Sequence, residues 1–187
     1  MPITILDPNA ALIVIDLQKG LLAYPTVQPI GDIIARAGAL ADAFRRRGLP
    51  VVLVNVAGGA PGRTEQARPR GELSAGWTDL VPELNQQSQD HLVTKRTWGA
   101  FTNTGLEAHL KALGVTAVVI SGVSTSIGVE STAREAYACG FNVALAVDAM
   151  TDTSAEAHLN SVTRIFPKLG ETGVTEEIIA LLNGASP

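Results

Sequence analysis

The sequence predicts an α/β fold in which helices cover both faces of a parallel sheet. Short, continuous apolar runs of strand length alternate along the chain with segments that have helical spacing. Apolar runs without polar alternation are typical of strands buried on both faces, as in parallel sheets. Regular alternation of strand and helix indicates right-handed βαβ units. A chain of 187 residues suits one domain, and we expect that domain to span residues 1–187.

The first part of the chain contains two predicted strands with a helix between them. Apolar runs at 10–15 and 51–56 have strand length, and residues 30–44 show helical spacing. Arg45-Arg46-Arg47 followed by Gly48 is typical of the last turn of a helix, because cations interact favourably with its free carbonyl groups. We therefore interpret these arginines as a solvated helix end rather than a binding patch.

The region 57–76 differs in composition from the rest of the chain. It is rich in Gly, Pro and Arg and has almost no large apolar residues. Ordered connections of this length are usually functional. We interpret this region as a lid over a site, with a merely flexible surface loop as the alternative. A short helix is expected at 77–84.

The second part of the chain continues the alternation. Thr104 to Glu107 and Thr153 to Glu156 have the spacing of capping boxes, which mark helix starts. The predicted strands are 91–94, 115–121 and 142–147, with a short extended piece at 168–171. The predicted helices are 104–113, 127–139, 153–166 and 175–182.

Composition and motifs exclude several classes of function. The formal net charge of −4 gives no attraction to nucleic acid or to acidic membranes. The sequence has neither an apolar run of membrane-spanning length nor a signal-peptide pattern. One cysteine, Cys139, cannot form a disulfide within the chain, and we expect a reducing, cytoplasmic setting. No GxGxxG fingerprint follows the first strand and no P-loop is present, so a nucleotide site has no support.

The carboxyl ends of the predicted strands carry the best candidates for chemistry, because ligands bind there in open parallel sheets. Asp16 and Lys95 each end an apolar strand, which is a costly position for a charge. If the two strands lie close together, the side chains can meet. Their spacing alone leaves open whether they form a catalytic pair or a plain buried ion pair. Asn55, Asp148 and the turn at Gly122 lie at other strand ends.

The segment from Ser121 to Ala136 is the feature around which we expect the site to form. It passes from a buried strand through a turn of small residues into an Ala-rich helix. The N–H groups of such a turn and the unpaired N–H groups of the helix start point the same way. This arrangement suits an anion or a developing oxyanion.

Other polar residues have plainer expected roles. The histidines His91, His109 and His158 are scattered without the spacing of metal ligands, so we expect no metal and no cofactor. Cys139 precedes Gly140 at a helix end, whereas reactive cysteines prefer helix N-termini, so we expect a structural role. Asp148 precedes a predicted turn and is expected to cap or brace it.

Three motifs in order resemble those of the isochorismatase-like hydrolases, also called the cysteine hydrolase superfamily, over nearly the whole chain. They are Leu12 to Gln18, Lys95 to Phe101, and Gly122 to Ala136 followed by Gly140-Phe141-Asn142 and Asp148-Ala149. The resemblance implies a three-layer α/β/α fold with a six-stranded parallel sheet, and a homodimer or homotetramer. It also implies a catalytic Asp and Lys, which match Asp16 and Lys95, and a cis peptide at Val123-Ser124.

The sequence departs from the family pattern at one position. Gly128 stands where most members have their nucleophilic cysteine, and Cys139 lies about three helical turns further on, too far to replace it. A thioester route to amide hydrolysis therefore lacks its nucleophile. Residues 55–59 also lack the acid and histidines that hold the metal of nicotinamidases. The sequence thus disfavours a metal-dependent nicotinamidase.

Glycine at this position also resembles true isochorismatases, which cleave a vinyl ether without a covalent intermediate. In that mechanism the aspartate protonates the enol-ether carbon and water adds. A subset of uncharacterised members shares both the glycine and the Lys-Arg-x-Trp-Gly-Ala-Phe motif. We therefore expect a hydrolase of a small anionic metabolite, with catalytic residues Asp16, Lys95 and Gly128. The alternatives are a catalytically silent metabolite-binding homologue and an amidase that uses water directly.

The remaining site predictions concern substrate contacts. Trp98 and Phe101 follow Lys95 and could line a pocket, although core packing is an equal alternative. Arg63, Arg68 and Arg70 on the long loop could clamp carboxylates, with plain solvent-exposed arginines as the alternative. The full set of expected substrate-binding residues is Gln18, Trp98, Phe101, Ser124, Thr125, Arg63 and Arg70. Lys95 should lower the pKa of Asp16, whereas a general acid needs a raised pKa, so burial of Asp16 would have to offset the lysine.

Overall fold

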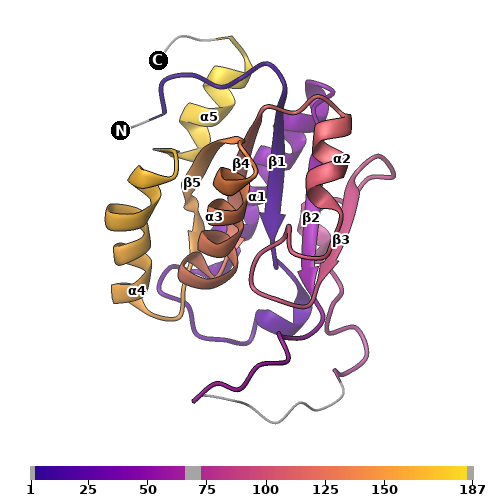
Figure 1. Ribbon diagram of the computed structural model, residues 1–187, viewed down its shortest axis with the longest axis vertical. Coiled ribbons are helices and arrows are strands. Elements are labelled where there is room, and N and C mark those ends of the chain that lie inside the picture. The colour runs from indigo at the N-terminus through magenta and orange to yellow at the C-terminus, as the bar shows by residue number, and fades with distance from the viewer. Residues whose placement is uncertain (1–2, 66–72, 185–187) are drawn as a thin grey trace.

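The computed structural model describes residues 3–65 and 73–184 and has the predicted α/β architecture (Figure 1). One six-stranded sheet has the order β3-β2-β1-β4-β5-β6, and every neighbouring pair is parallel. The six-stranded parallel sheet is therefore confirmed. The strands are β1 (Ala10–Ile15), β2 (Val51–Val56), β3 (His91–Lys95), β4 (Ala117–Val123), β5 (Asn142–Thr151) and β6 (Glu171–Gly173).

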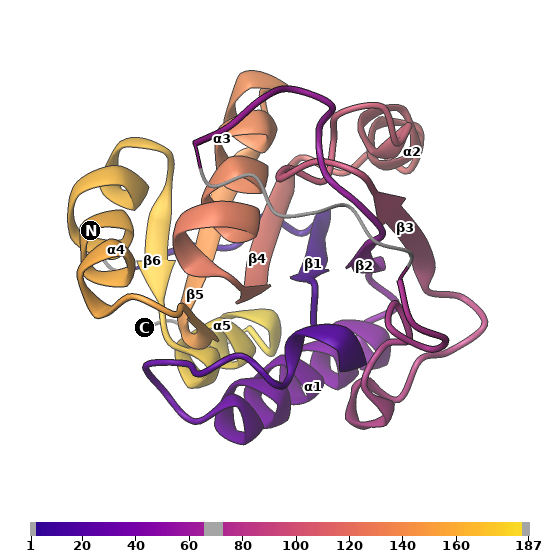
Figure 2. The same ribbon diagram turned by 90° about the horizontal axis from the view of Figure 1, so that it is seen from below.

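Helices cover both faces of this sheet. Seen from the carboxyl end of the strands, α1 and α5 lie on one side and α2 and α3 on the other, with α4 next to α3 toward the β6 edge (Figure 2). This is the three-layer arrangement that the resemblance implied. The α-helices are α1 (Ile30–Arg46), α2 (Leu106–Ala112), α3 (Glu130–Ala138), α4 (Ala155–Asn160) and α5 (Thr175–Leu182). Shorter 3₁₀ turns lie at Lys19–Leu21, Pro82–Leu84 and Phe166–Lys168, and π-helical turns at Thr125–Val129 and Ser161–Ile165.

The position of β1 in the middle of the sheet explains why its sequence is apolar throughout. Leu12 and Val14 pack in the core beneath α1 and α5. Ile13 and Ile15 pack in the second core, beneath α2 and α3. Because both faces are covered, each successive side chain of the strand is buried, and no polar alternation remains.

Two expected elements differ in extent from the structure. β5 continues to Thr151 rather than ending near residue 147, because its pairing with β4 shifts register between Ile120 and Gly122 and then resumes. The expected helix at 77–84 is wrong in its first half. There Leu80 forms an antiparallel bridge with Gln18, and only Pro82–Leu84 is helical.

Helix starts in the second half also differ in detail. α2 begins one residue after Gly105, which takes a left-handed conformation and makes no side-chain cap, so the capping box expected at Thr104 is wrong. At α4 the capping residue is Ser154, whose hydroxyl accepts from the Ala157 N–H, rather than Thr153. α3 begins only at Glu130, because a π-helical turn precedes it.

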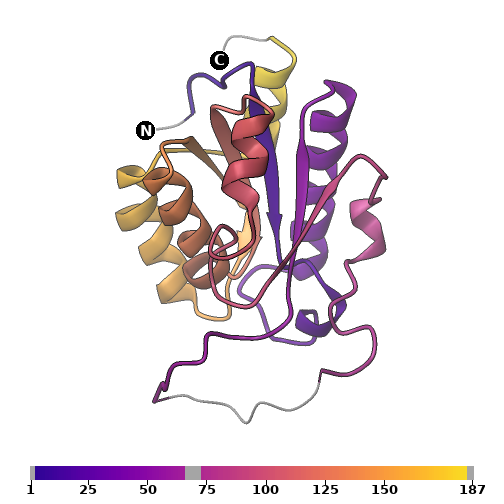
Figure 3. The same ribbon diagram turned by 45° about the vertical axis from the view of Figure 1, so that its right-hand side comes forward.

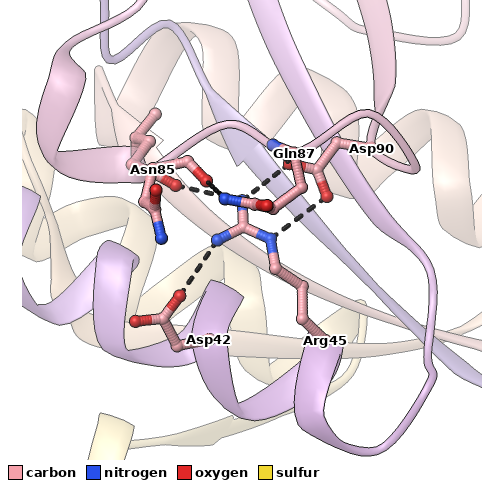
Figure 4. A network of polar contacts seen from close by, with 6 residues as sticks. Asp42, Arg45, Asn85, Gln87 and Asp90 are labelled. Carbon is pink, nitrogen blue, oxygen red and sulfur yellow. Dashed lines mark hydrogen bonds and ion pairs between the residues drawn. The ribbon is translucent and has the colours of Figure 1, made fainter.

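The end of α1 is more buried than the basic triplet suggested (Figure 4). Arg45 is held by the Asp90 carboxylate, with 2.7 Å between Arg45 Nη2 and Asp90 Oδ2, and only 8% of the Arg45 side chain is exposed. It also donates to Asp42 and to the Leu84 carbonyl. A solvated role is therefore wrong for Arg45. The helix does stop as predicted, since Gly48 takes the left-handed conformation that ends it.

The long connection after β2 contains neither helix nor strand in its described parts, 57–65 and 73–76. Figures 1 and 3 show those parts beyond the carboxyl ends of the strands. Arg68 and Arg70 lie outside the described residues. The lid interpretation therefore stays a prediction.

Candidate active site

Asp16 is the first residue beyond the end of β1, and its backbone leaves the strand abruptly. Its φ is 54°, a left-handed conformation that Asp tolerates better than most residues. The Asp16 N–H still donates to the Val54 carbonyl at 2.9 Å, so the residue remains anchored to β2. A left-handed residue breaks the alternation of side chains along a strand. The carboxyl group consequently lies at the carboxyl end of the sheet's central strands, and Asp16 is only 4% exposed.

The side chains of Lys95 and Asp16 meet, as their positions at the ends of two strands predicted. Lys95 Nζ lies 2.7 Å from Asp16 Oδ2, and 2% of the lysine side chain is exposed. The ammonium also donates to the carbonyls of Thr97 at 3.2 Å and Trp98 at 2.9 Å. A lysine ammonium has three N–H donors, and these three acceptors use all of them. Lys95 is therefore a fixed partner of Asp16 and has no donor left for a substrate.

The Asp16 carboxyl group has a pKa above the ordinary value of an aspartic acid. Burial raises the pKa of Asp16 to about 6, while the charge and hydrogen bond of Lys95 act to lower it. Desolvation thus outweighs the cation. Asp16 Oδ1 is buried and has no hydrogen-bond partner within the described residues. Oδ1 is therefore the oxygen of this carboxyl group that the Lys95 ammonium does not contact.

Gly128 lies directly beside this carboxyl group. A Cβ atom placed on Gly128 would be 3.2 Å from Asp16 Oδ2, 3.1 Å from the Val123 carbonyl and 2.9 Å from Ile15 Cγ2. A side chain at position 128 would therefore contact the Asp16 carboxyl group, and glycine places only backbone there. The nearby peptide bond between Val123 and Ser124 is cis, as the resemblance implied.

Asp152 holds the turn in place, and sequence reasoning missed it. Asp152 Oδ2 accepts from the N–H and the hydroxyl of Ser126, at 2.7 and 2.8 Å. Its other oxygen accepts from the N–H groups of Thr153 and Ser154. The signal was present, because the apolar residues Ala149 and Met150 continue the strand and make Asp152 its true end.

Thr125 is bound to a histidine that had no expected role in the site. Its buried hydroxyl lies 2.8 Å from His158 Nδ1, so helix α4 contacts the turn at this point. Burial lowers the pKa of His158, and the Asp152 carboxylate opposes that effect. The Thr125 hydroxyl therefore braces the turn, and the sequence alone offered no pairing for it.

Gln18 and Phe101 are both engaged in packing within the fold. The buried Gln18 amide accepts from the Val56 N–H and donates to the carbonyls of Val56 and Trp77. It holds the chain beyond β1 against the end of β2. The Phe101 ring packs against Phe141, with 5.9 Å between centroids, in the core beneath α2 and α3.

Trp98 and Arg63 are exposed, Ser124 is half-buried, and Arg70 lies outside the described residues. The Trp98 side chain is 62% exposed, so only its carbonyl takes part in the Lys95 cluster. Asp148 lies within β5, so the turn expected directly after it is wrong. Its carboxylate instead accepts from the N–H and hydroxyl of Thr175 and caps the start of α5. Within the described residues, no three His, Cys, Asp or Glu side chains form a group that could hold a metal ion. In the same residues, no helix has both the length and the hydropathy needed to cross a membrane.

Comparison with known proteins shows the family of this chain. The family model described as the isochorismatase domain matches residues 10–177. This chain belongs to the isochorismatase family. An uncharacterized family member of Bacillus subtilis, YwoC, is 40% identical over 91% of this chain and 93% of its own length. Nicotinamidase 3 of Arabidopsis thaliana is 32% identical over 81% of this chain and 79% of its own.

A solved isochorismatase-family structure from Burkholderia thailandensis is similar throughout. Its TM-score is 0.92 at 40% sequence identity, covering 97% of this chain and 99% of the other. The fold of the isochorismatase family thus extends over nearly the whole chain, and the Asp16–Lys95 pair lies within the matched region.

Proposed function

We propose that this isochorismatase-family protein hydrolyses a vinyl ether on a small anionic metabolite, without a covalent enzyme intermediate. The observation that carries the proposal is the Asp16 carboxyl group, which is buried, has a pKa of about 6 and lies beside Gly128. At pH 7 an acid with that pKa is protonated in roughly a tenth of the molecules, compared with about a thousandth for an ordinary aspartic acid. It can protonate carbon, which a fully ionised carboxylate cannot do.

The reaction needs only a proton and a water molecule. Protonated Asp16 gives its proton through Oδ1 to the methylene carbon of the vinyl ether, which leaves an oxocarbenium ion. Water adds to that ion, and the proton it loses returns to the carboxylate. The hemiketal then breaks its C–O bond, giving an alcohol and a keto product. The only catalytic function required of the protein is a well-placed acid and base.

The neighbours of Asp16 have supporting roles in this proposal. Lys95 stabilises the carboxylate that forms when the proton leaves, without contacting the substrate. Glycine at 128 places no side chain against the acid, where a Cβ would lie 3.2 Å from Asp16 Oδ2. The N–H groups of Ser124 and Gly128 would hold developing negative charge if the substrate has a carbonyl. Arg63, and Arg96 next to Lys95, are exposed cations that suit an anionic substrate.

The direct test is the variant Asp16→Asn assayed against a panel of vinyl ethers, amides and carbamoyl compounds. Removing a general acid costs about 10²–10⁴-fold in rate, so turnover of the vinyl ether should fall by that factor. Asp79→Asn is the matched control, because Asp79 forms an exposed pair with Lys19. Full turnover by Asp16→Asn would contradict the proposal.

Amide hydrolysis by water that Asp16 activates is a second candidate, and the nicotinamidase relative favours it. In that reaction Asp16 acts as a base and must be ionised. The two candidates therefore predict opposite changes of rate with pH. Tight binding of a metabolite with no turnover across the panel would instead support a silent binding homologue.

A further inference from the structure

The loop that follows β3 is fastened to helix α3 by one buried hydroxyl group. Thr132 Oγ1 donates to the Gly128 carbonyl at 2.7 Å and accepts from the Ala100 N–H at 3.1 Å. Thr132 is fully buried. A helical threonine commonly donates to the carbonyl four residues earlier. The second bond, to a residue from another part of the chain, is what distinguishes Thr132.

A carboxylate one turn further along α3 fastens the same loop. The two oxygens of Glu135 accept from the Phe101 N–H at 2.8 Å and from the Thr102 hydroxyl at 2.5 Å. A side chain at Gly99 would collide with this carboxylate, so the loop approaches α3 as closely as a glycine allows. The loop is therefore attached to α3 through consecutive residues.

This loop also supplies the Thr97 and Trp98 carbonyls that bind the Lys95 ammonium. Its position consequently decides where the ammonium lies relative to Asp16. Gly128, at the other end of the Thr132 bridge, lies beside the same carboxyl group. The Thr132 hydroxyl thus connects the loop after Lys95 (residues 96–102, the Lys95 loop) to the turn that contains Gly128 (Thr125–Val129, the Gly128 turn).

We propose that Thr132 is a positioning residue, which couples the Gly128 turn to the Lys95 loop and so holds Lys95 against Asp16. The proposal rests on the proposed function for its catalytic meaning, but its structural content can be tested without a substrate. Loss of the hydroxyl leaves a buried Ala100 N–H without an acceptor, and the loop must move to satisfy it. The two carbonyls then move with the loop, and the ammonium follows them away from Asp16.

The test is a titration of the Asp16 carboxyl carbon by ¹³C NMR in wild type, Thr132→Val and Thr132→Ser. Valine keeps the shape of threonine and removes the hydroxyl. The pKa of Asp16 should be higher by about 1 in Thr132→Val, the low end of what a neighbouring cation contributes. Thr132→Ser should restore the wild-type value, since serine keeps both bonds.

Thr163→Val is the matched control. Its hydroxyl donates only to the Leu159 carbonyl four residues earlier, at an exposed position. The Asp16 titration should be unchanged in this variant. An unchanged pKa of Asp16 in folded Thr132→Val would overturn the proposal, as would failure of Thr132→Ser to restore it.

Should Thr132→Val fail to fold, Glu135→Gln tests the same loop from a half-buried position. An amide has one acceptor oxygen instead of two, so one of the two loop bonds is lost. The pKa of Asp16 should again rise, and an unchanged value would overturn the proposal. If wild type cleaves no vinyl ether, the proposed function fails while these titrations still decide the role of Thr132.

Discussion

At the scale of single residues, the two oxygens of the Asp16 carboxyl group differ in their surroundings. Oδ2 contacts the Lys95 ammonium, whereas Oδ1 is buried and has no partner in the described residues. A proton on the carboxyl group is therefore placed on Oδ1, away from the cation. In the proposed reaction, this division would let Asp16 be an ion-pair partner of Lys95 and a proton donor at once.

The first prediction concerns pH. The pKa of Asp16 is raised to about 6, so the protonated form persists to higher pH than for an ordinary aspartic acid. A general acid acts only when protonated. For vinyl-ether hydrolysis, kcat/KM should be constant below pH 6 and fall about tenfold per pH unit above it. A pH–rate profile measures this, and a rate that rises through pH 6 would identify Asp16 as a base instead.

The second prediction concerns the ion pair. In Lys95→Met, the Asp16 carboxylate loses its cation, and its pKa should rise further above 6. Breaking a buried pair costs about 3–5 kcal/mol of unfolding free energy, which urea denaturation at pH 7 would measure. Lys19→Met is the control, because the exposed Lys19–Asp79 pair should contribute less than about 1 kcal/mol. Equal losses in the two variants would contradict the prediction.

The third prediction concerns Gly128. A methyl group there would lie 2.9 Å from Ile15 Cγ2, closer than side chains tolerate. Gly128→Ala should therefore lose about 1–3 kcal/mol of stability through overpacking. Gly31→Ala in α1 is the control, because no atom lies within 4 Å of its Cβ, and alanine there should stabilise the helix by about 0.5–1 kcal/mol. Thermal unfolding of both variants gives the comparison.

Sequence reasoning identified Asp16 and Lys95 because a charge at the end of an apolar strand is conspicuous. It missed Asp152 because it ended the strand near residue 147, although Ala149 and Met150 continue the apolar run and the register shift carries β5 beyond Asp148. It also could not foresee that Gln18 would use its amide on backbone groups. Which neighbours a buried polar side chain finds depends on strand order and loop path, and neither is encoded in local spacing.

At the scale of elements, the ends of helices connect the layers of the fold. α1 is joined to the segment before β3 by Arg45 and Asp90, whose side chains are 8% and 1% exposed. Figure 4 shows how the guanidinium lies between Asp42, Asp90 and the chain near Asn85. A run of three arginines at the end of an amphipathic helix does not reveal which one is buried. That depends on which of them faces the segment that packs against the helix, here Leu84 to Asp90.

The fourth prediction follows from this cluster. Arg45→Met leaves the buried Asp90 carboxylate unpaired and should cost about 3–5 kcal/mol of unfolding free energy. The cluster is separate from the Asp16 site, so the folded variant should keep wild-type kcat/KM. Arg46→Met is the control, because Arg46 is exposed on the same helix and its loss should change stability by less than about 0.5 kcal/mol. Chemical denaturation and an assay of each variant check both parts.

At the scale of the whole molecule, the strand order β3-β2-β1-β4-β5-β6 brings the site together. The chain reverses its direction of winding between β1 and β4, and ligands bind at such a point in open α/β sheets. Asp16 follows β1 and the Gly128 turn follows β4, one on each side of that point. Alternating strands and helices predicted the fold class from sequence, and the resemblance implied six strands, but the order of the strands came only with the structure.

The fifth prediction is the oligomeric state, for which the resemblance implies a homodimer or homotetramer. Large apolar side chains such as Ile5, Tyr137 and Leu159 are more than half exposed in the single chain, which is consistent with further burial on assembly. Light scattering coupled to gel filtration should give two or four times the mass of one chain. A mass equal to one chain at micromolar concentration would contradict the prediction.

The position of β1 at the centre of the sheet has a consequence for biosynthesis. Its partner β2 follows soon after it, but its other partner β4 is made much later, since Ala10 lies opposite Ala117. While the ribosome makes the intervening chain, the backbone N–H and C=O groups along one edge of β1 remain unpaired. Such an edge is a template for association with other nascent chains. This protein should therefore depend on chaperones most strongly until the residues of β4 have left the exit tunnel.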